Sequence, residues 1–106
     1  MQRKSGSELS DDGHHIVIDG RKWRATDPLV PEEVAAELRR HLMAARRAVR
    51  DALRQADAEA EGRARARVQM AKTALGERGA AWWEQSEGKR KERWEEGLKR
   101  LDEEQS

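Results

Sequence analysis

Apolar residues recur every three or four positions through the middle of the chain, which predicts a long amphipathic helix from about residue 31 to 56. Pro31 suits the first turn of a helix, and Glu32 and Glu33 suit its positive end. The spacing is typical of a coiled-coil seam, so we expect the apolar stripe to pack against a neighbouring helix. The stripe consists of Ala35, Leu38, Leu42, Ala45, Val49, Ala52 and Ala56.

Two short alternating runs on either side of Asp19-Gly20 predict a β-hairpin near the N-terminus. Asp-Gly tolerates the positive φ angles that both central residues of a type I′ turn need. A two-residue loop sets the register and places Ile16 opposite Trp23. Because Ile16, Ile18 and Trp23 share one face, we expect that face to be buried. A lone two-stranded hairpin is marginal in water, so the hairpin must lie on the helices or be extended by another chain.

A second helix is expected from about residue 63 to 77, with an apolar stripe at Ala64, Val68, Ala71 and Leu75. The segment 55–62 is acidic and rich in small residues, and its glycine favours a turn between the two helices. A short connection of this kind makes the two helices antiparallel neighbours. One continuous helix through Leu75 is the alternative.

The C-terminal part of the sequence is more charged. Gly76 to Gly79 end the second helix, and Trp82-Trp83 follow. A highly charged helix is expected over residues 86–104, with Ser86 as its N-cap. Its apolar edge is limited to Trp94, Leu98 and Leu101, so docking on the domain and a solvated tail both remain open.

Together these elements predict a mostly α fold with a small β-hairpin. A two-stranded N-terminal hairpin is followed by an antiparallel helical hairpin and then by a charged C-terminal helix. We expect residues 1–13 to be a disordered tail and residues 14–83 to form a single small domain, which the Trp-Trp segment closes. We expect residues 84–106 to be a charged helix or tail.

Composition narrows the possible classes of protein. The 106 residues suffice for one domain with a modest core, and the absence of cysteine excludes disulfides and thiolate metal sites. No apolar run approaches the roughly 20 residues of a membrane span. The first residues have no hydrophobic segment of the kind found in secretory signals. We therefore expect a cytoplasmic protein with no membrane partner.

Arginines gather on one flank of the first predicted helix. At about 100° per residue, with Leu38 at zero, they fall between roughly 80° and 200°, away from the apolar stripe. A row of cations on a rigid support is the expected footprint of binding to nucleic-acid phosphates. The candidate phosphate-binding residues are Arg39, Arg40, Arg46, Arg47, Arg50 and Arg54 on the first helix, with Arg63 and Arg67 on the second. Further cations are Arg65 and Lys72 on the second helix and Arg21, Lys22 and Arg24 on the strands.

The sequence contains no helix-turn-helix spacing, zinc-finger pattern or aromatic interleaving for base stacking. We therefore expect sequence-nonspecific association with DNA or RNA through backbone phosphates, weakening steeply as salt rises. A merely solvated helix face is one alternative. Another is a protein-interaction module or homodimeric adaptor, binding itself or another protein. Such a module would use the Ala44/Ala48 side, the hairpin edge or the charged C-terminal helix.

The tryptophans have two interpretations. Trp82, Trp83 and Trp94 are candidates for an exposed aromatic partner surface. A chain without Phe or Tyr also needs aromatic side chains in its core, so we expect at least one of Trp82 and Trp83 to be buried.

Catalysis and metal binding have little support. The serines lie in predicted tails or at a helix cap, and the carboxylates cluster at helix ends where solvent is expected. His14, His15 and His41 do not have metal-ligand spacing. We therefore expect a non-enzymatic protein with no cofactor and no metal.

Two stretches of the chain resemble a known family. Residues 14–28 read HHIVIDGRKWRATDP. Further on, LMAARRAVR at residues 42–50 is followed by AKTALGERG at 71–79 and by WW at 82–83. In this order they resemble a family of small, uncharacterised actinobacterial proteins that sometimes carry the label "biopolymer transporter Tol". The resemblance covers roughly residues 14–83 and brings no established activity with it.

Overall fold

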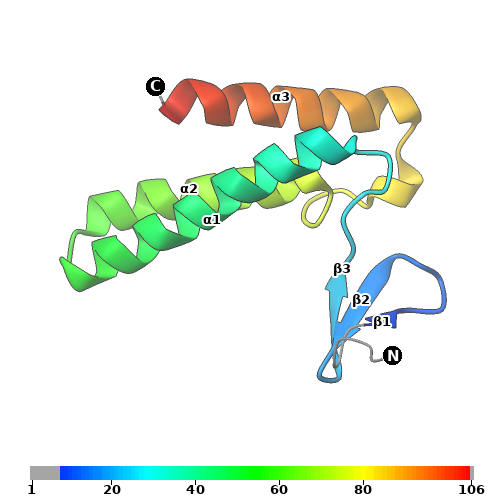
Figure 1. Cartoon of the computed structure of the whole chain (residues 1–106), viewed down its shortest axis with the longest axis horizontal. Coiled ribbons are helices and arrows are strands. Elements are labelled where there is room, and N and C mark those ends of the chain that lie inside the picture. The colour runs from blue at the N-terminus through cyan, green and yellow to red at the C-terminus, as the bar shows by residue number, and fades with distance from the viewer. Residues whose placement is uncertain (1–7, 106) are drawn as a thin grey trace.

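A computed structural model describes residues 8–105, with the side chains of residues 8 and 105 excepted, and shows helices packed beside a small sheet (Figure 1). The strands are β1 (Glu8–Leu9), β2 (His15–Ile18) and β3 (Arg21–Arg24). The helices are α1 (Glu32–Arg54), α2 (Ala58–Leu75) and α3 (Glu87–Gln105), and the 3-10 turn η1 (Trp82–Glu84) precedes α3. The predicted fold class is therefore confirmed.

The β-hairpin has the predicted register. Ile16 lies opposite Trp23, and both turn residues have positive φ, 51° at Asp19 and 80° at Gly20. The sheet has a third strand that the sequence analysis did not predict, because β1 pairs with β2 and gives the order β1-β2-β3. The predicted disordered tail is therefore wrong for residues 8–13, which form β1 and a turn. Residues 1–7 lie outside the described residues.

The two long helices form an antiparallel hairpin, which rules out one continuous helix. Their turn spans residues 55–57, several residues before Gly62, which is inside α2. Asp57 is the N-cap of α2, and its carboxylate accepts a hydrogen bond of 3.0 Å from the amide of Ala60. Such a cap satisfies amides that the first turn leaves without partners. The helix therefore begins at the capping residue and tolerates the glycine.

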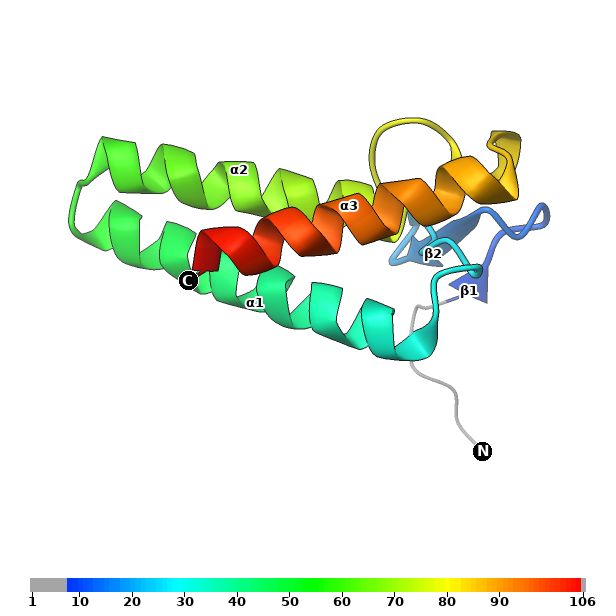
Figure 2. The ribbon, with the colours of Figure 1, turned by 90° about the horizontal axis from the view of Figure 1, so that it is seen from above.

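Helix α3 docks on the helical hairpin. Figure 2 shows it lying along α1 and α2 at the end nearest the sheet and stopping partway along them. Leu38, Leu75 and Leu101 come from the three helices and are fully buried together. Gly97 lets α3 approach α2 closely, because a Cβ there would lie 2.6 Å from the Cβ of Ala74. The charged C-terminal helix is thus part of the folded unit.

The sheet lies on the opposite side of the α1–α2 layer from α3 (Figure 1). It is attached through η1 and its neighbours. The imidazole of His14 stacks on Trp83 at 4.0 Å between ring centroids, and the rings of Trp82 and Trp83 meet edge to face at 5.2 Å. The indole N–H of Trp82 donates to the carbonyl of Ala25 at 3.0 Å. This contact fixes the end of β3 to the segment before α3.

The hairpin face that carries Ile16, Ile18 and Trp23 corrects one prediction. Trp23 and Ile18 were expected to be buried, but their side chains are 43% and 41% exposed. His14 and Ala25 fix one end of the sheet to η1, and farther along only long charged side chains, cations and Glu77, lie against Trp23 and Ile18. The guanidinium of Arg21 lies 4.7 Å from the centre of the Trp23 ring, and the ammonium of Lys72 lies 5.9 Å from it.

Candidate functional site

The arginines of α1 form a continuous exposed surface, which we call the α1 arginine face. All six are exposed. Two have a carboxylate nearby: Arg40 lies 4.0 Å from Glu37, and Arg54 forms a short ion pair with Asp51. The other four make no side-chain hydrogen bond or ion pair within the described part of the chain. These four are Arg39, Arg46, Arg47 and Arg50.

A broad hollow lies along the outer side of α1 beside this face. It has a volume of about 620 Å³, and its lining includes Arg39, Arg40 and Arg47. The acidic side of the hollow includes Asp102 of α3, which forms a 2.8 Å bond with His41. Three of the predicted arginines therefore face one open space from a single rigid helix.

The two predicted arginines of α2 do not extend the α1 arginine face. Arg63 and Arg67 lie eleven and seven residues before Ala74, so at 3.6 residues per turn they share its side of the helix. Ala74 is the residue that Gly97 of α3 approaches. Lys72 lies on the other side of α2, near the Trp23 ring of the sheet. The structure thus separates Arg63 and Arg67 from the α1 arginine face.

Lys72 is the predicted cation of α2 that lies near the sheet. Burial lowers the pKa of its ammonium group, and the positive charges of Arg78 and Arg46 lower the pKa further, against the opposing effect of Glu77. Arg46 belongs to α1, the helix that packs along α2. Each of these cations destabilises the charge of the others, so an anion between them would relieve the repulsion.

A cavity lies beside Lys72, between the exposed hairpin face and the C-terminal end of α2. Its volume is about 220 Å³. We call it the Trp23 cavity, and its lining residues are Ile16, Ile18, Trp23, Arg24, Lys72, Glu77 and Arg78. It therefore combines three apolar side chains with three cations and one carboxylate.

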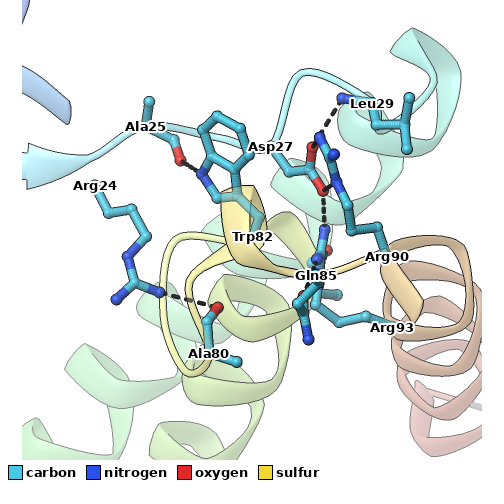
Figure 3. Close-up of polar contacts among 10 residues, drawn as sticks. Arg24, Ala25, Asp27, Leu29, Ala80, Trp82, Gln85, Arg90 and Arg93 are labelled. Atoms are coloured by element: carbon cyan, nitrogen blue, oxygen red, sulfur yellow. Dashed lines mark hydrogen bonds and ion pairs between the residues drawn. The ribbon is translucent and has the colours of Figure 1, made fainter. Parts of the chain in front are cut away.

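The charged side chains of the Trp23 cavity differ in whether they already have hydrogen-bond partners in the protein. The guanidinium of Arg24 donates to the carbonyls of Gly79 at 2.7 Å and Ala80 at 3.3 Å, and Figure 3 shows the second of these bonds. Glu77 accepts a hydrogen bond of 2.6 Å from the hydroxyl of Thr26. Within the described residues, Lys72 has no hydrogen-bonded partner, so it is the cation most available to a ligand.

The tryptophans predicted as a partner surface lie mostly in the interior. Trp82 is 7% exposed and Trp94 is 5% exposed, so the partner-surface prediction is wrong for both. Trp82 fixes the sheet to the helices, and Trp94 belongs to the core between them. Trp83 is half-buried against His14. The expectation that at least one of Trp82 and Trp83 is buried is confirmed.

The most enclosed charged group of the described chain is Asp27, which is 1% exposed in the segment between β3 and α1. Its carboxylate accepts hydrogen bonds from the backbone amide of Leu29 and from the side chains of Arg90 and Arg93 (Figure 3). Arg90 donates through two nitrogens, at 3.0 and 2.6 Å, and Arg93 donates at 2.6 Å. Arg93 also donates to Gln85. We call this set the Asp27 network.

The Asp27 network joins the sheet, α2 and α3 at one point. The amide of Asp27 donates to the carbonyl of Leu75 at 2.9 Å, and Arg93 donates to the carbonyl of Ala74 at 3.3 Å. Burial alone raises the pKa of the Asp27 carboxyl, but the hydrogen bonds from Arg90 and Arg93 outweigh it, so the pKa lies below its ordinary value. The Asp27 network therefore consists of charged side chains that stabilise the fold, and its arginines are not available to a ligand.

The Asp27 network is not predicted by the sequence pattern, although one signal is present. Arg90 lies four residues before Trp94 and eleven before Leu101, so it occupies the apolar stripe of α3. An arginine at such a position must reach a carboxylate or the solvent. Nothing in the local pattern indicates that the carboxylate is Asp27, 63 residues earlier in the chain.

Two further observations concern metals and membranes. Within residues 8–105, no three or more His, Asp or Glu side chains are grouped so as to hold a metal ion. In the same part of the chain, no helix has both the length and the apolar character needed to cross a membrane.

Comparisons of the chain with protein families, with curated proteins and with solved structures found no match.

Proposed function

We propose that this protein is a non-enzymatic nucleic-acid-binding protein whose α1 arginine face contacts backbone phosphates without reading base sequence. The observation that carries the proposal is that four of the six exposed arginines have no carboxylate partner among the described residues. Arginine binds phosphate well because its planar guanidinium presents several donors in a fixed geometry. A row of such groups on one helix is a surface suited to a repeating anion.

The length of the face matches several phosphates. Arg39 and Arg54 are fifteen residues apart, which is about 22 Å along an α-helix at ~1.5 Å per residue. Phosphates on one strand of a duplex follow each other at about 3.4 Å along the axis. The face therefore spans about six nucleotides, and contacts of this kind make affinity depend strongly on salt.

Protein interaction is the second candidate, and one observation favours it. A groove of about 480 Å³ lies between the start of α1 and α3, and its apolar lining includes the partly buried Val34 and Leu98. The free edge of the sheet is a weaker candidate, because β3 carries three cations in four residues. Charged residues on an edge strand oppose pairing with another strand.

A binding measurement with two matched variants tests the proposal. One variant replaces Arg46, Arg47, Arg50 and Arg54 with glutamine. The control variant replaces four exposed cations of α3, Lys89, Lys91, Lys99 and Arg100, with glutamine. Both variants lose four positive charges, so they have the same net charge. The affinity of each protein for fluorescein-labelled mixed-sequence DNA and RNA is measured by anisotropy at a series of salt concentrations.

We expect the α1 variant to bind weakly, with a slope of log affinity against log salt that is shallower by about 3, because each lost phosphate contact removes roughly 0.7–0.9. The α3 variant should keep the wild-type slope. Equal loss in both variants would show that only net charge matters, and wild-type affinity in the α1 variant would contradict the proposal. Self-association that is insensitive to salt, measured by light scattering, would favour the protein-interaction candidate.

A further inference from the structure

The Trp23 cavity has features that phosphate binding alone does not explain. Trp23 and Ile18 are more than two-fifths exposed, and Ile16 beside them is only partly covered. Apolar side chains that stay exposed forgo the stabilisation of roughly 25 cal/mol per Å² that burial would give. A contiguous exposed apolar patch with a polar rim often marks a binding site. Here the rim has three cations and one carboxylate, Glu77, which accepts a hydrogen bond from Thr26, and such a rim beside an indole ring suits an aromatic, anionic ligand.

We propose that Trp23 stacks against an unpaired base of single-stranded DNA or RNA in this cavity, while Lys72 and Arg46 hold the adjacent phosphates. The proposal rests on the nucleic-acid binding proposed above and specifies which form of nucleic acid is preferred. Proteins that bind single strands combine a cationic track for the backbone with aromatic side chains on which bases stack. The α1 arginine face supplies the track, and Trp23 supplies the aromatic surface.

The size of the cavity fits a base better than a larger ligand. Its volume of about 220 Å³ is below the roughly 300–1,000 Å³ of pockets for drug-sized molecules. Arg21 contacts the Trp23 ring but does not line the cavity, so the ring surface inside the cavity is left to Lys72 and the ligand. A flat ring system can therefore enter beside Trp23.

The position of Lys72 connects the stacked base to the backbone. Its ammonium lies 5.9 Å from the centre of the Trp23 ring, on the helix that packs against the α1 helix of Arg46. When a base covers the ring, Lys72 exchanges its contact with Trp23 for a phosphate of the same strand. Arg46 and the rest of the α1 arginine face then continue along the backbone.

A paired base cannot present its flat surface to Trp23, because its neighbours in the duplex cover both sides. The inference therefore predicts a preference for single strands that depends on Trp23 alone. Binding of duplex DNA to the α1 arginine face should not depend on this residue. That difference separates the inference from the proposed function.

The test compares Trp23→Leu, Trp23→Phe and the α1 variant on a single strand of DNA, the same strand of RNA, and the matching duplex. Trp23→Leu should bind both single strands about tenfold more weakly, because base stacking on an aromatic side chain contributes roughly 5- to 150-fold in affinity. Its duplex affinity should not change. Trp23→Phe, which keeps an aromatic ring, should bind like the wild type. The α1 variant should lose affinity for all three.

If Trp23→Leu keeps full single-strand affinity while the α1 variant loses it, the inference is wrong and the proposed function stands. If neither variant differs from the wild type in affinity, both the inference and the proposed function are wrong. The affinity for a mononucleotide is also measured. If the mononucleotide binds as tightly as the strand, the α1 arginine face does not contribute to binding by contacting the backbone.

A measurement on the unaltered protein guards against misfolding of the variants. A single strand that contains 5-bromouracil is bound to the wild-type protein, irradiated, and the crosslinked residue is identified by mass spectrometry. The inference predicts a crosslink at Trp23. A crosslink at the half-buried Trp83, or a bound strand that crosslinks to no tryptophan, would contradict it.

Discussion

The Asp27 network and the α1 arginine face use the same side chain in opposite ways. Arg90 and Arg93 are largely buried, and both donate to one enclosed carboxylate. The arginines of α1 are exposed, and four of them have no acidic partner among the described residues. The first region holds three parts of the chain together, and the second presents charge to the solvent.

The comparison shows that clustering of arginines is a poor guide to their role until their partners are known. In the sequence, Arg90 and Arg93 belong to a helix with many charges of both signs, and only the position of Arg90 on the apolar stripe sets it apart. The α1 arginines look like a cluster. The structure distinguishes the two groups by the carboxylate that each arginine reaches. Four predictions test this distinction, from the largest expected effect to the smallest.

Removing the charge of Asp27 should have the largest effect on folding. Asp27→Asn leaves two largely buried guanidinium groups without a counter-charge, and we expect a loss of about 3–5 kcal/mol in the free energy of unfolding. Urea denaturation measures it. The control is Glu61→Gln, which removes the partner of the exposed Arg65. That change should cost no more than about 1 kcal/mol. Similar losses in both variants would contradict the difference between buried and exposed arginines.

Two glycine substitutions should change stability in opposite directions. Gly76 has a φ of 87°, and a Cβ there would lie 2.8 Å from the Cβ of Asp27. Gly76→Ala should therefore destabilise the protein by about 1–3 kcal/mol. Gly62 lies inside α2 with open space around it, so Gly62→Ala should stabilise the protein by about 0.5–1 kcal/mol. Thermal unfolding of both variants would show the opposite signs, and a neutral Gly76→Ala would disprove the close approach to Asp27.

Acid should weaken the Asp27 network. The carboxyl of Asp27 has a lowered pKa in the folded protein, whereas in the unfolded chain it titrates near the ordinary value of about 3.9. Its contribution is therefore complete above about pH 5 and is lost as the pH falls below the unfolded value toward the folded one. The free energy of unfolding of the wild type should fall more steeply in this range than that of Asp27→Asn. Parallel curves would show that Asp27 does not titrate differently on folding.

The α1 arginine face should contribute least to stability. Replacing Arg46, Arg47, Arg50 and Arg54 with glutamine removes one exposed ion pair and several repulsions between like charges. We expect the free energy of unfolding to change by less than about 1 kcal/mol, since exposed substitutions away from special contacts have small effects. A loss comparable to that of Asp27→Asn would show that these arginines hold the fold together.

The parts of the fold set by neighbouring residues could be predicted from the sequence. The stripe on α1 and the Asp-Gly turn depend on spacing within a few residues. Both are confirmed, except that Ala56 lies beyond the end of α1 and is exposed. The turn between the long helices lies within the predicted segment 55–62, but Gly62 suggests a second helix that begins at about residue 63, whereas α2 begins at Ala58. The N-cap at Asp57 decides the boundary instead. A capping carboxylate before a run of helix-forming residues is a local signal that could have been used.

Other features depend on residues far apart in the chain, and sequence patterns do not show them. The alternation in β3 indicated which face carries Trp23, but not that Lys72 would be the residue opposite it. The pairing of Asp27 with Arg90 and Arg93 depends on the docking of α3, which a narrow apolar edge could not establish. The exposure of the α1 arginines followed from helix geometry alone, so the first helix of the candidate site could be predicted.

The most direct test of the account is an NMR titration of the arginine side chains with a mixed-sequence single strand. The Nε–Hε signals of the arginines are assigned, and their shifts are followed as the strand is added at low salt. The account predicts shifts at Arg46, Arg47 and Arg50, which are free, and none at Arg90 and Arg93, which Asp27 already holds. Shifts confined to arginines outside α1, or no shifts at a concentration where the strand is bound, would contradict it.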